Sequence, residues 1–276
     1  MYTLNCNGRL IVVDKPLVMG IINITPDSFY EGSRVNSVDA ILRKAELMII
    51  EDADILDIGG QSTRPGSEKI KPEEELRRVV PAIEAILKAF PGTLISIDTF
   101  HASVAREAGN AGALIVNDIS AGNFDPEMMG TVAAMNIPYI CMHMKGEPDR
   151  MQNNPHYENV TAEVLDFLAD KVTACVQAGI KDIIIDPGFG FGKNIRHNFT
   201  LLRELSAFRI LDKPIMVGLS RKSTIYKTLG ISADEALNGT TVLHTIALMN
   251  GANILRVHDV KEAKEAVVLY KSYMNA

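Results

Sequence analysis

Eight short apolar runs recur along the 276 residues, and they limit the possible folds more than any other feature of the sequence. Each run has the length of a strand and is rich in Ile, Val and Leu, as is typical of a parallel sheet buried on both faces. Segments with helical periodicity lie between them, for example residues 38–52, 72–90 and 158–179. The runs cover residues 17–24, 54–59, 94–99, 114–120, 138–144, 182–188, 214–220 and 253–259.

Strand and helix alternate from residue 17 onward without a break in composition. Eight such units predict an α/β fold of the closed (β/α)8 TIM barrel type. Residues 1–16 predict a short β-hairpin that covers the bottom of the barrel. We therefore expect one domain over residues 1–276, with the hairpin at 1–16 and the barrel at 17–276. The alternative fold is an open, doubly wound parallel sheet.

Composition and charge exclude several classes of protein. Hydrophobic residues make up 47% of the chain and charged residues 22%, as in a globular protein with a sizeable core, and the net charge of −6 argues against a nucleic-acid partner. Cys6, Cys141 and Cys175 have no metal-ligand spacing and are too few for a disulfide framework, which favours a cytoplasmic location and small apolar packing roles. No run approaches the roughly 20 apolar residues of a membrane span, so we expect no membrane partner.

A glycine-rich stretch, DPGFGFGKN at residues 186–194, raises the question of phosphate binding. It fails the phosphate-loop pattern twice, because Gly188 and Gly192 are one residue too close and Asn194 replaces the required hydroxyl. It also fails the dinucleotide pattern, whose third glycine would come one residue later. Another role must explain Asp186 and these glycines, and Lys193 is assigned none.

Polar residues gather at the carboxyl ends of the eight runs, where barrels hold their active sites. A single Asp there is as easily a cap or turn residue, but so many on one rim indicate a site. We leave Asp57 and Asp118 to structural roles. The residues are Asn23, Asp57, Asp98, Thr99, Asn117, Asp118, His143, Asp186, Ser220, Arg221, Lys222, Ser223, Arg256 and His258.

Lys222, Arg256 and His258 follow the seventh and eighth runs, where barrels often bind phosphate, and they form a cationic subset. Asn23, across the rim, could add an oxygen ligand to a water-rich Mg²⁺ site if a diphosphate supplied the others. A second subset offers acceptors and an amide for a flat heterocycle with several N–H donors. That subset is Asp98, Asn117 and Asp186.

Several segments in order, from about Leu17 to Val260, closely resemble the dihydropteroate synthase family of folate-pathway enzymes that sulfonamides inhibit. They read NITPDSF, GGQSTRPGS, SIDT, VNDIS, MHMKGEP, DPGFGFGKN, GLSRKS and LRVHDV. The resemblance implies a (β/α)8 barrel that transfers a pterinylmethyl group. Such an enzyme condenses 6-hydroxymethyl-7,8-dihydropterin diphosphate with 4-aminobenzoate and releases diphosphate. It also implies a Mg²⁺ cofactor and a homodimer, for which the apolar helix at residues 240–251 could supply the interface.

The resemblance also implies a role for each matching residue. Asn23 is the magnesium contact, and Asp98 and Lys222 are the catalytic residues. Thr63, Asp98, Asn117, Met144, Asp186, Lys222, Arg256, Val257 and His258 bind the pterin diphosphate. Phe29, Arg64, Pro65 and Ser223 bind 4-aminobenzoate. The Gly-, Ser- and Pro-rich segments 25–37 and 61–72 are candidate lids or ordinary linkers. His101, His143, His197 and His244 are given no role beyond packing or capping.

The implied mechanism begins with loss of diphosphate, assisted by magnesium and the cations, to leave a pterin cation that Asp98 stabilises before the arylamine attacks. No side chain has to act as a covalent nucleophile. Three other functions stay open. They are an aldolase with Lys222 as Schiff-base amine, a pterin-binding methyltransferase, and a pterin-binding paralogue without synthase activity.

Overall fold

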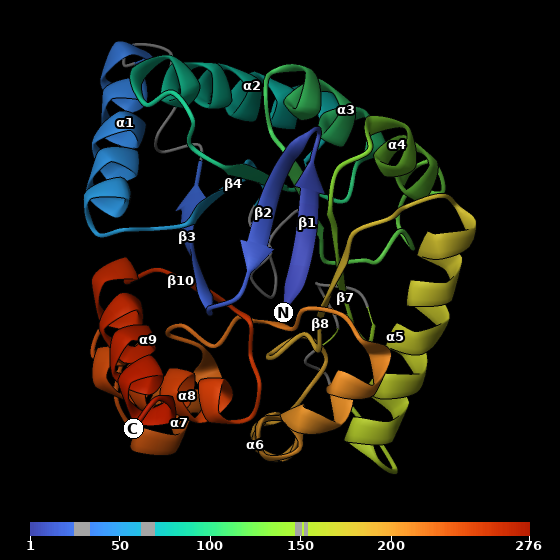
Figure 1. The fold of residues 1–276 in the computed structure, drawn as a ribbon, viewed down its shortest axis with the longest axis vertical. Coiled ribbons are helices and arrows are strands. Elements are labelled where there is room, and N and C mark those ends of the chain that lie inside the picture. Colours follow the sequence, from blue (N-terminus) through green and yellow to red (C-terminus); the bar gives the residue numbers. More distant parts are fainter. Residues whose placement is uncertain (25–33, 62–69, 147–150, 152–153) are drawn as a thin grey trace.

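The computed structural model describes residues 1–24, 34–61, 70–146, 151 and 154–276 of the chain. Eight parallel strands form a barrel, with helices around it and a hairpin across the end that faces the viewer in Figure 1. The barrel strands are β3 (Leu17–Asn23), β4 (Ile55–Gly59), β5 (Ile95–Asp98), β6 (Ile115–Asp118), β7 (Tyr139–Met142), β8 (Ile183–Asp186), β9 (Met216–Val217) and β10 (Ile254–Val257).

The strand order identifies the barrel. Neighbours run β8-β7-β6-β5-β4-β3-β10-β9, which is the order of the chain with no reversal. A parallel bridge between Ile185 and Ile215, and a 2.9 Å hydrogen bond from Ile185 N to Pro214 O, bring the two ends of the sheet together. The (β/α)8 prediction is confirmed, and the open doubly wound alternative is wrong because such a sheet reverses its strand order.

The helices follow the predicted alternation, with ends that differ by a few residues. Pro72 opens α2, followed by three glutamates that favour a helix N-terminus, and the Asn159 side chain caps α5 through the N–H groups of Thr161 and Ala162. The helices are α1 (Arg34–Ile50), α2 (Pro72–Ala89), α3 (Ala102–Asn110), α4 (Met128–Met135), α5 (Val160–Gln177), α6 (Ile195–Arg203), α7 (Ser223–Leu229), α8 (Leu237–Met249) and α9 (Val260–Met274), with a 3₁₀ helix at Leu205–Leu211.

The strands are shorter than the apolar runs that predict them. The run at residues 214–220 yields only the two residues of β9. Leu219 continues the apolar pattern because it is buried under the helices, and Ser220 already belongs to the rim. Apolar patterning reports burial, and burial extends beyond the strand hydrogen bonds.

A layer of apolar side chains fills the hairpin end of the barrel interior. Residues two apart on a strand point to the same face, so each strand contributes alternate residues to this layer. The hairpin adds three side chains from outside. The buried residues of the layer are Leu4, Cys6, Val13, Leu17, Met19, Ile55, Leu94, Ile115, Ile140, Ile184, Met216 and Ile254.

The predicted hairpin is β1 (Tyr2–Cys6) and β2 (Arg9–Val13), paired antiparallel. Asn7 and Gly8 form its turn, both with positive φ (51° and 90°), as a tight hairpin turn requires. Asn5 N donates to Asp182 Oδ2 at 3.1 Å and ties the hairpin to the start of β8. The three cysteines are free and buried, as expected.

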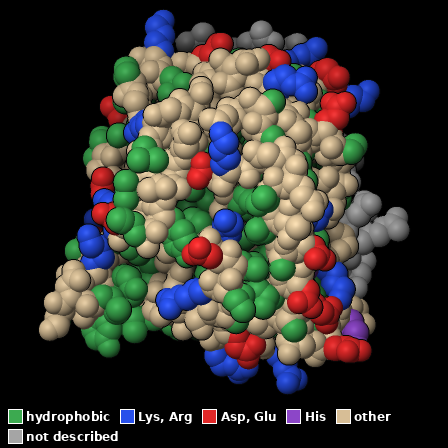
Figure 2. Space-filling model, turned by 45° about the vertical axis from the view of Figure 1, so that its right-hand side comes forward, with side chains coloured by type: hydrophobic (Ala, Val, Ile, Leu, Met, Phe, Trp, Pro, Cys, Tyr) green, Lys and Arg blue, Asp and Glu red, His purple; other side chains and the backbone are tan. Residues whose placement is uncertain are grey.

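The surface agrees with the acidic net charge. On the face drawn in Figure 2, acidic and basic side chains are interspersed, in contrast to a surface built for nucleic acid. Within the described residues, none of the helices combines the length and the apolar content needed to cross a membrane.

Candidate active site

A small pocket lies among the residues at the carboxyl end of the strands. Strand pairing places Asn23, Gly59, Asp98 and Asn117 side by side on four consecutive strands, so their polar groups share one level of the rim. The pocket is lined by Asn117, Ile119, Met142, Asp186, Phe191, Met216, Gly218, Lys222 and Arg256. The pocket brings together four of the polar residues expected at the rim: Asn117, Asp186, Lys222 and Arg256.

Arg256 is the centre of the charge network under the pocket. Its Nε donates to Asp57 Oδ2 and its Nη2 to Asp98 Oδ2, both at 2.6 Å. Asn117 Nδ2 donates to the same Asp57 oxygen at 3.0 Å. Asp57 is fully buried, so its structural role is to orient Arg256 and Asn117. The structure shows no hydrogen bond from the third guanidinium nitrogen, Nη1, to the described residues.

Asp98 has an unusual environment for a carboxylate. Burial raises the pKa of Asp98 to about 7, against the opposing effect of Arg256. Its Oδ1 is buried and has no hydrogen-bond partner among the described residues. A buried acceptor without a partner can receive a ligand N–H or stabilise a positive charge.

Asp186 and Lys222 face each other across the pocket. Burial raises the pKa of Asp186, although Lys222 opposes the shift, and burial lowers the pKa of Lys222 to about 8, although Asp186 opposes it. Asp186 Oδ1 accepts from Gly188 N at 2.7 Å. Lys222 Nζ donates to Phe189 O and lies 4.6 Å above the centre of the Phe191 ring.

The glycines after Asp186 have a steric explanation. Gly188, Gly190 and Gly192 all have positive φ, which favours glycine. A Cβ on Gly188 would lie 1.8 Å from His143 O, and one on Gly192 would lie 2.1 Å from Lys145 O. The loop therefore needs glycine to pack against the chain that follows β7.

Lys193 has a larger role than the sequence indicated. It is 2% exposed, and its Nζ lies 2.8 Å from His143 Nδ1 and donates to Gly188 O and Phe191 O at 2.9 and 3.1 Å. Burial lowers its pKa well below the usual value. Lys193 thus holds the glycine loop in shape, and burial lowers the pKa of His143 to about 2 beside it.

The apolar walls of the pocket escaped the sequence interpretation, which searched for polar groups. Phe100, Ile119 and Met142 form a small buried cluster, and Met144 and Phe191 pack against it. Met144 was predicted as a pterin contact and lies at this wall. Phe191 lies between two glycines. A large aromatic residue in a glycine-rich loop is unusual, and this could have identified it as a candidate contact.

His258 differs from the predicted cation. Burial and the nearby Arg256 lower the pKa of His258 to about 4, so it is neutral at pH 7. Its Nδ1 lies 3.0 Å from Ser220 Oγ, and its backbone N donates to that oxygen at 3.1 Å. Of the predicted cationic subset, Arg256 and Lys222 therefore remain as cations, and His258 is neutral.

Asn23 can be tested as a metal ligand. It is exposed at the end of β3, and its Oδ1 would lie 3.5 Å from a Cβ at Gly59, next to Asp98. No group of three or more His, Cys, Asp or Glu that could hold a metal occurs among the described residues. An amide oxygen beside an open rim fits Mg²⁺, which keeps water and substrate oxygens as most of its ligands.

The other predicted residues have varied locations. Ser223 opens α7, next to Lys222. The Val257 side chain is fully buried in the core between the strands and the surrounding helices, so only its backbone could contact a ligand. Asp118 accepts from Ser120, Gly122 and Tyr139, a structural role as expected. Phe29, Thr63, Arg64 and Pro65, with most of the two candidate lids, lie outside the described residues.

The histidines without an assigned role behave as packing or capping groups. His197 belongs to a capping box with Asn194 at the start of α6, and His244 is buried in α8. A larger hollow lies at the opposite end of the barrel, beside the hairpin and Lys181. It has none of the ionic network found at the rim.

Comparison with known proteins agrees with this geometry. Residues 19–258 match a family described as "Pterin binding enzyme". The dihydropteroate synthase of Escherichia coli (strain K12) is 43% identical over 271 residues, covering 98% of this chain and 95% of the relative. The Yersinia pestis dihydropteroate synthase with a sulfonamide drug complex has a TM-score of 0.93 and 39% identity over 100% of both chains. The Xanthomonas albilineans dihydropteroate synthase with 4-aminobenzoic acid has a TM-score of 0.91 and 40% identity, covering 99% of this chain and 98% of that one.

Proposed function

The chain belongs to the dihydropteroate synthase family of pterin-binding enzymes, and from this we propose how its rim residues divide the reaction. The enzyme condenses 6-hydroxymethyl-7,8-dihydropterin diphosphate with 4-aminobenzoate to give 7,8-dihydropteroate and diphosphate, a step of folate synthesis. The roles of individual residues below are our proposal.

The pterin ring lies in the rim pocket. The observation that carries this assignment is a pocket with apolar walls and the buried acceptor Asp186. Its lining residue Arg256 pairs with Asp98, whose buried Oδ1 has no partner among the described residues. A pterin presents a flat ring with amino and amide N–H donors, which matches Asp186, Asn117 and Asp98. Met144 and Phe191 supply flat apolar contact.

The diphosphate lies on the β10 side of the rim. Arg256 turns Nη1 toward it while Asp57 and Asp98 hold the other two nitrogens. Neutral His258 donates from Nε2 when Nδ1 accepts from Ser220 Oγ. Thr63, outside the described residues, is the further diphosphate ligand that we propose, and the backbone of Val257 is another.

Asn23 is the proposed protein ligand of Mg²⁺, whose other ligands would be water and diphosphate oxygens. When bound, the ion would neutralise part of the negative charge on the leaving diphosphate. Everything else in the reaction is assigned to side chains of the chain itself.

4-Aminobenzoate binds above the pterin, with its carboxylate at Ser223. This residue follows Lys222 directly and opens α7, so both substrates meet at one short segment. Phe29, Arg64 and Pro65 complete this second subsite in our proposal. They lie outside the described residues, and the assignment rests on the family.

The chemical step follows from these positions. The exocyclic C–O bond breaks, its electron pair leaves with the diphosphate, and the positive charge spreads into the pterin. Ionised Asp98 stabilises that charge, and Lys222 and Arg256 stabilise the departing anion. The arylamine nitrogen then bonds to the methylene carbon and releases one proton. No side chain bonds to the substrate, so no covalent enzyme intermediate forms.

We further propose that the enzyme is a cytoplasmic homodimer. Val242, Ile246 and Met249 on α8 are 50%, 40% and 48% exposed, and they form an apolar stripe at helical spacing. The buried side of the same helix, which includes His244, faces the barrel. The three buried thiols suit a reducing compartment.

One assay tests the proposed function. The purified chain is incubated with the pterin diphosphate, 4-aminobenzoate and Mg²⁺, and dihydropteroate and diphosphate are measured together. We expect both products in equal amounts. Pterin binding without product would instead favour the paralogue that lacks synthase activity, and diphosphate without dihydropteroate would show that the arylamine site is missing.

A further inference from the structure

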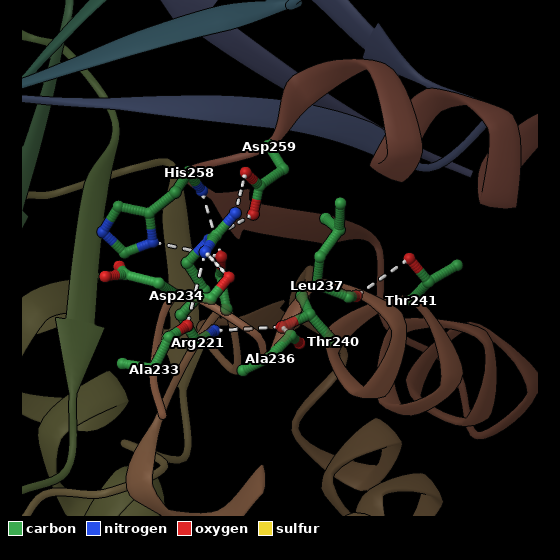
Figure 3. A network of polar contacts seen from close by, with 10 residues as sticks. Arg221, Ala233, Asp234, Ala236, Leu237, Thr240, Thr241, His258 and Asp259 are labelled. Carbon is green, nitrogen blue, oxygen red and sulfur yellow. Dashed lines mark hydrogen bonds and ion pairs between the residues drawn. The ribbon is translucent and has the colours of Figure 1, made fainter. Parts of the chain in front are cut away.

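Two consecutive residues after β9 pair with two consecutive residues after β10. Ser220 Oγ accepts from His258 N at 3.1 Å and lies 3.0 Å from His258 Nδ1. Arg221 then donates from Nε and Nη2 to the two carboxylate oxygens of Asp259, at 2.9 and 2.8 Å. The two pairs form a staple between the exits of neighbouring strands (Figure 3).

Hydrogen bonds fix both the side chain and the backbone N–H of Arg221. Its Nη1 donates to the carbonyl oxygens of Ala233 and Asp234 at 3.3 and 2.7 Å, and its backbone N donates to Thr240 Oγ1 at 3.1 Å. Its φ is +53°, a conformation that costs free energy in a residue other than glycine. Such a backbone persists only where its surroundings fix it, and here the side chain provides that fixation.

Asp259 is used in an unexpected way. It stands at the N-cap of α9, where an Asp side chain usually accepts from the first N–H groups of the helix. The Asp259 side chain makes no such capping bond. Both its oxygens are directed to Arg221, which indicates that the fork geometry of the pair has taken precedence over the cap.

The staple lies between two substrate subsites. Lys222 and Ser223 come directly after Arg221. His258 comes directly before Asp259, and Arg256 lies three residues before it. Lys222 and Arg256 line the pocket, whereas Arg221 and Asp259 are not among its lining residues. A bidentate pair with most donors in use is suited to holding these neighbours in a fixed relation rather than to binding substrate.

We propose that Arg221 and Asp259 are positioning residues that keep the arylamine and pterin groups after β9 aligned with the diphosphate groups on β10. This inference rests on the proposed function and adds two residues that it does not assign. The competing role for Arg221 is direct contact with a substrate anion, and the two roles predict opposite behaviour for Asp259.

A double-mutant cycle separates the two roles. We expect Arg221→Gln and Asp259→Asn each to lower kcat/KM by about 10- to 100-fold, since small misplacement of reacting groups carries losses of this size. The double variant should lose no more kcat/KM than the single variant with the larger loss, because the same staple is broken in every case. Losses that multiply would overturn the proposal.

Diphosphate binding gives a readout that a general loss of stability does not mimic. Titration calorimetry with inorganic diphosphate and Mg²⁺ should show weaker binding for Asp259→Asn. If Arg221 contacts the anion directly, removal of its carboxylate partner would free the guanidinium, and Asp259→Asn would bind diphosphate as well as the wild type or better. That result would also overturn the proposal.

The matched control is Arg203→Gln, which breaks the exposed Arg203–Glu204 pair at the end of α6 and should keep wild-type kinetics. Thermal unfolding checks that each variant is folded, and Arg221→Lys replaces Arg221→Gln if the latter is not. Lys keeps the charge but cannot span both carboxylate oxygens, so it should show the same loss, and wild-type kinetics would contradict the staple. A wild-type chain that makes no dihydropteroate would overturn the function, while the diphosphate titration would still test the staple.

Discussion

The two ends of one barrel differ in what their side chains do. At the hairpin end, the strands turn Ile and Met side chains inward, and the hairpin seals them in a dry layer. At the rim, the next inward position carries a charge. The change takes one step of two residues on three strands, from Ile55 to Asp57, from Ile184 to Asp186 and from Ile254 to Arg256.

The two ends of the barrel therefore contribute differently to the stability of the fold and to its chemistry. Apolar burial at the hairpin end favours the folded state. At the rim, desolvation of charged groups opposes folding unless they pair, as Arg256 pairs with Asp57 and Asp98. The closed end supports the fold, and the rim holds groups whose pKa values are displaced by burial, as is common at functional sites.

The largest effect that would test this division is at the rim. In Asp98→Asn, we expect kcat to fall by about 100- to 1,000-fold, because the charge that stabilises the transition state is removed while the shape is kept. The affinity for pterin diphosphate should change by only a few fold. Wild-type kcat/KM should rise with pH toward and above 7, where Asp98 becomes ionised, and the variant should lose this rise. Equal losses in turnover and affinity would contradict the assigned role.

The next effect is at the closed end. Ile140 is fully buried in the inner layer, and Ile140→Ala should lower the free energy of unfolding by about 2 to 5 kcal/mol. The folded variant should keep its kcat, since no rim group is touched. Urea unfolding and initial rates measure the two quantities, and Ile140→Val is the smaller step in the same position. A large loss of kcat with unchanged stability would break the comparison.

A pH-dependent effect sharpens the comparison with a buried acid behind the rim. Glu75 on α2 is fully buried, and burial raises its pKa from 4.5 to about 8, with the Thr99 hydroxyl opposing. The folded chain therefore binds this proton more tightly than the unfolded chain. Between pH 4.5 and about 8, stability should fall with rising pH by up to about 1.4 kcal/mol per pH unit from this group, and the loss should end above pH 8.

Glu75→Gln isolates this contribution because Gln resembles the protonated acid. The variant should be nearly as stable as the wild type at low pH and more stable at pH 8 to 9. Unfolding curves at several pH values measure the difference between the two chains. A difference that stays constant with pH would show that Glu75 does not bind the extra proton.

The sequence predicted the fold well because apolar periodicity reports burial, and a barrel buries every strand on both faces. The strand ends were less accurate, as in residues 214–220, because Leu219 is buried outside the sheet. The rim positions of Asp98, Asp186 and Arg256 followed from the fold. Their pairing did not, since the carboxylates that hold Arg256 lie 199 and 158 residues away in the chain.

Two residues differ in burial or charge from what their residue type suggests. Lys193 was assigned no role, yet it is buried beside His143 and donates to the backbone carbonyl oxygens of Gly188 and Phe191. His258 was grouped with the cations, yet its surroundings keep it neutral. Residue type gives the ordinary charge state, and only the packing gives the actual one.

The hairpin is synthesised before every strand that it covers. The apolar partners of Leu4, Cys6 and Val13 are synthesised later, with the barrel strands. Asp182, the partner of Asn5, lies 177 residues further along the chain. Contacts of such separation form late and slowly, because the loop must close before the contact is gained. We therefore expect the hairpin to dock late in folding, when its docking covers the inner apolar layer of the newly made chain.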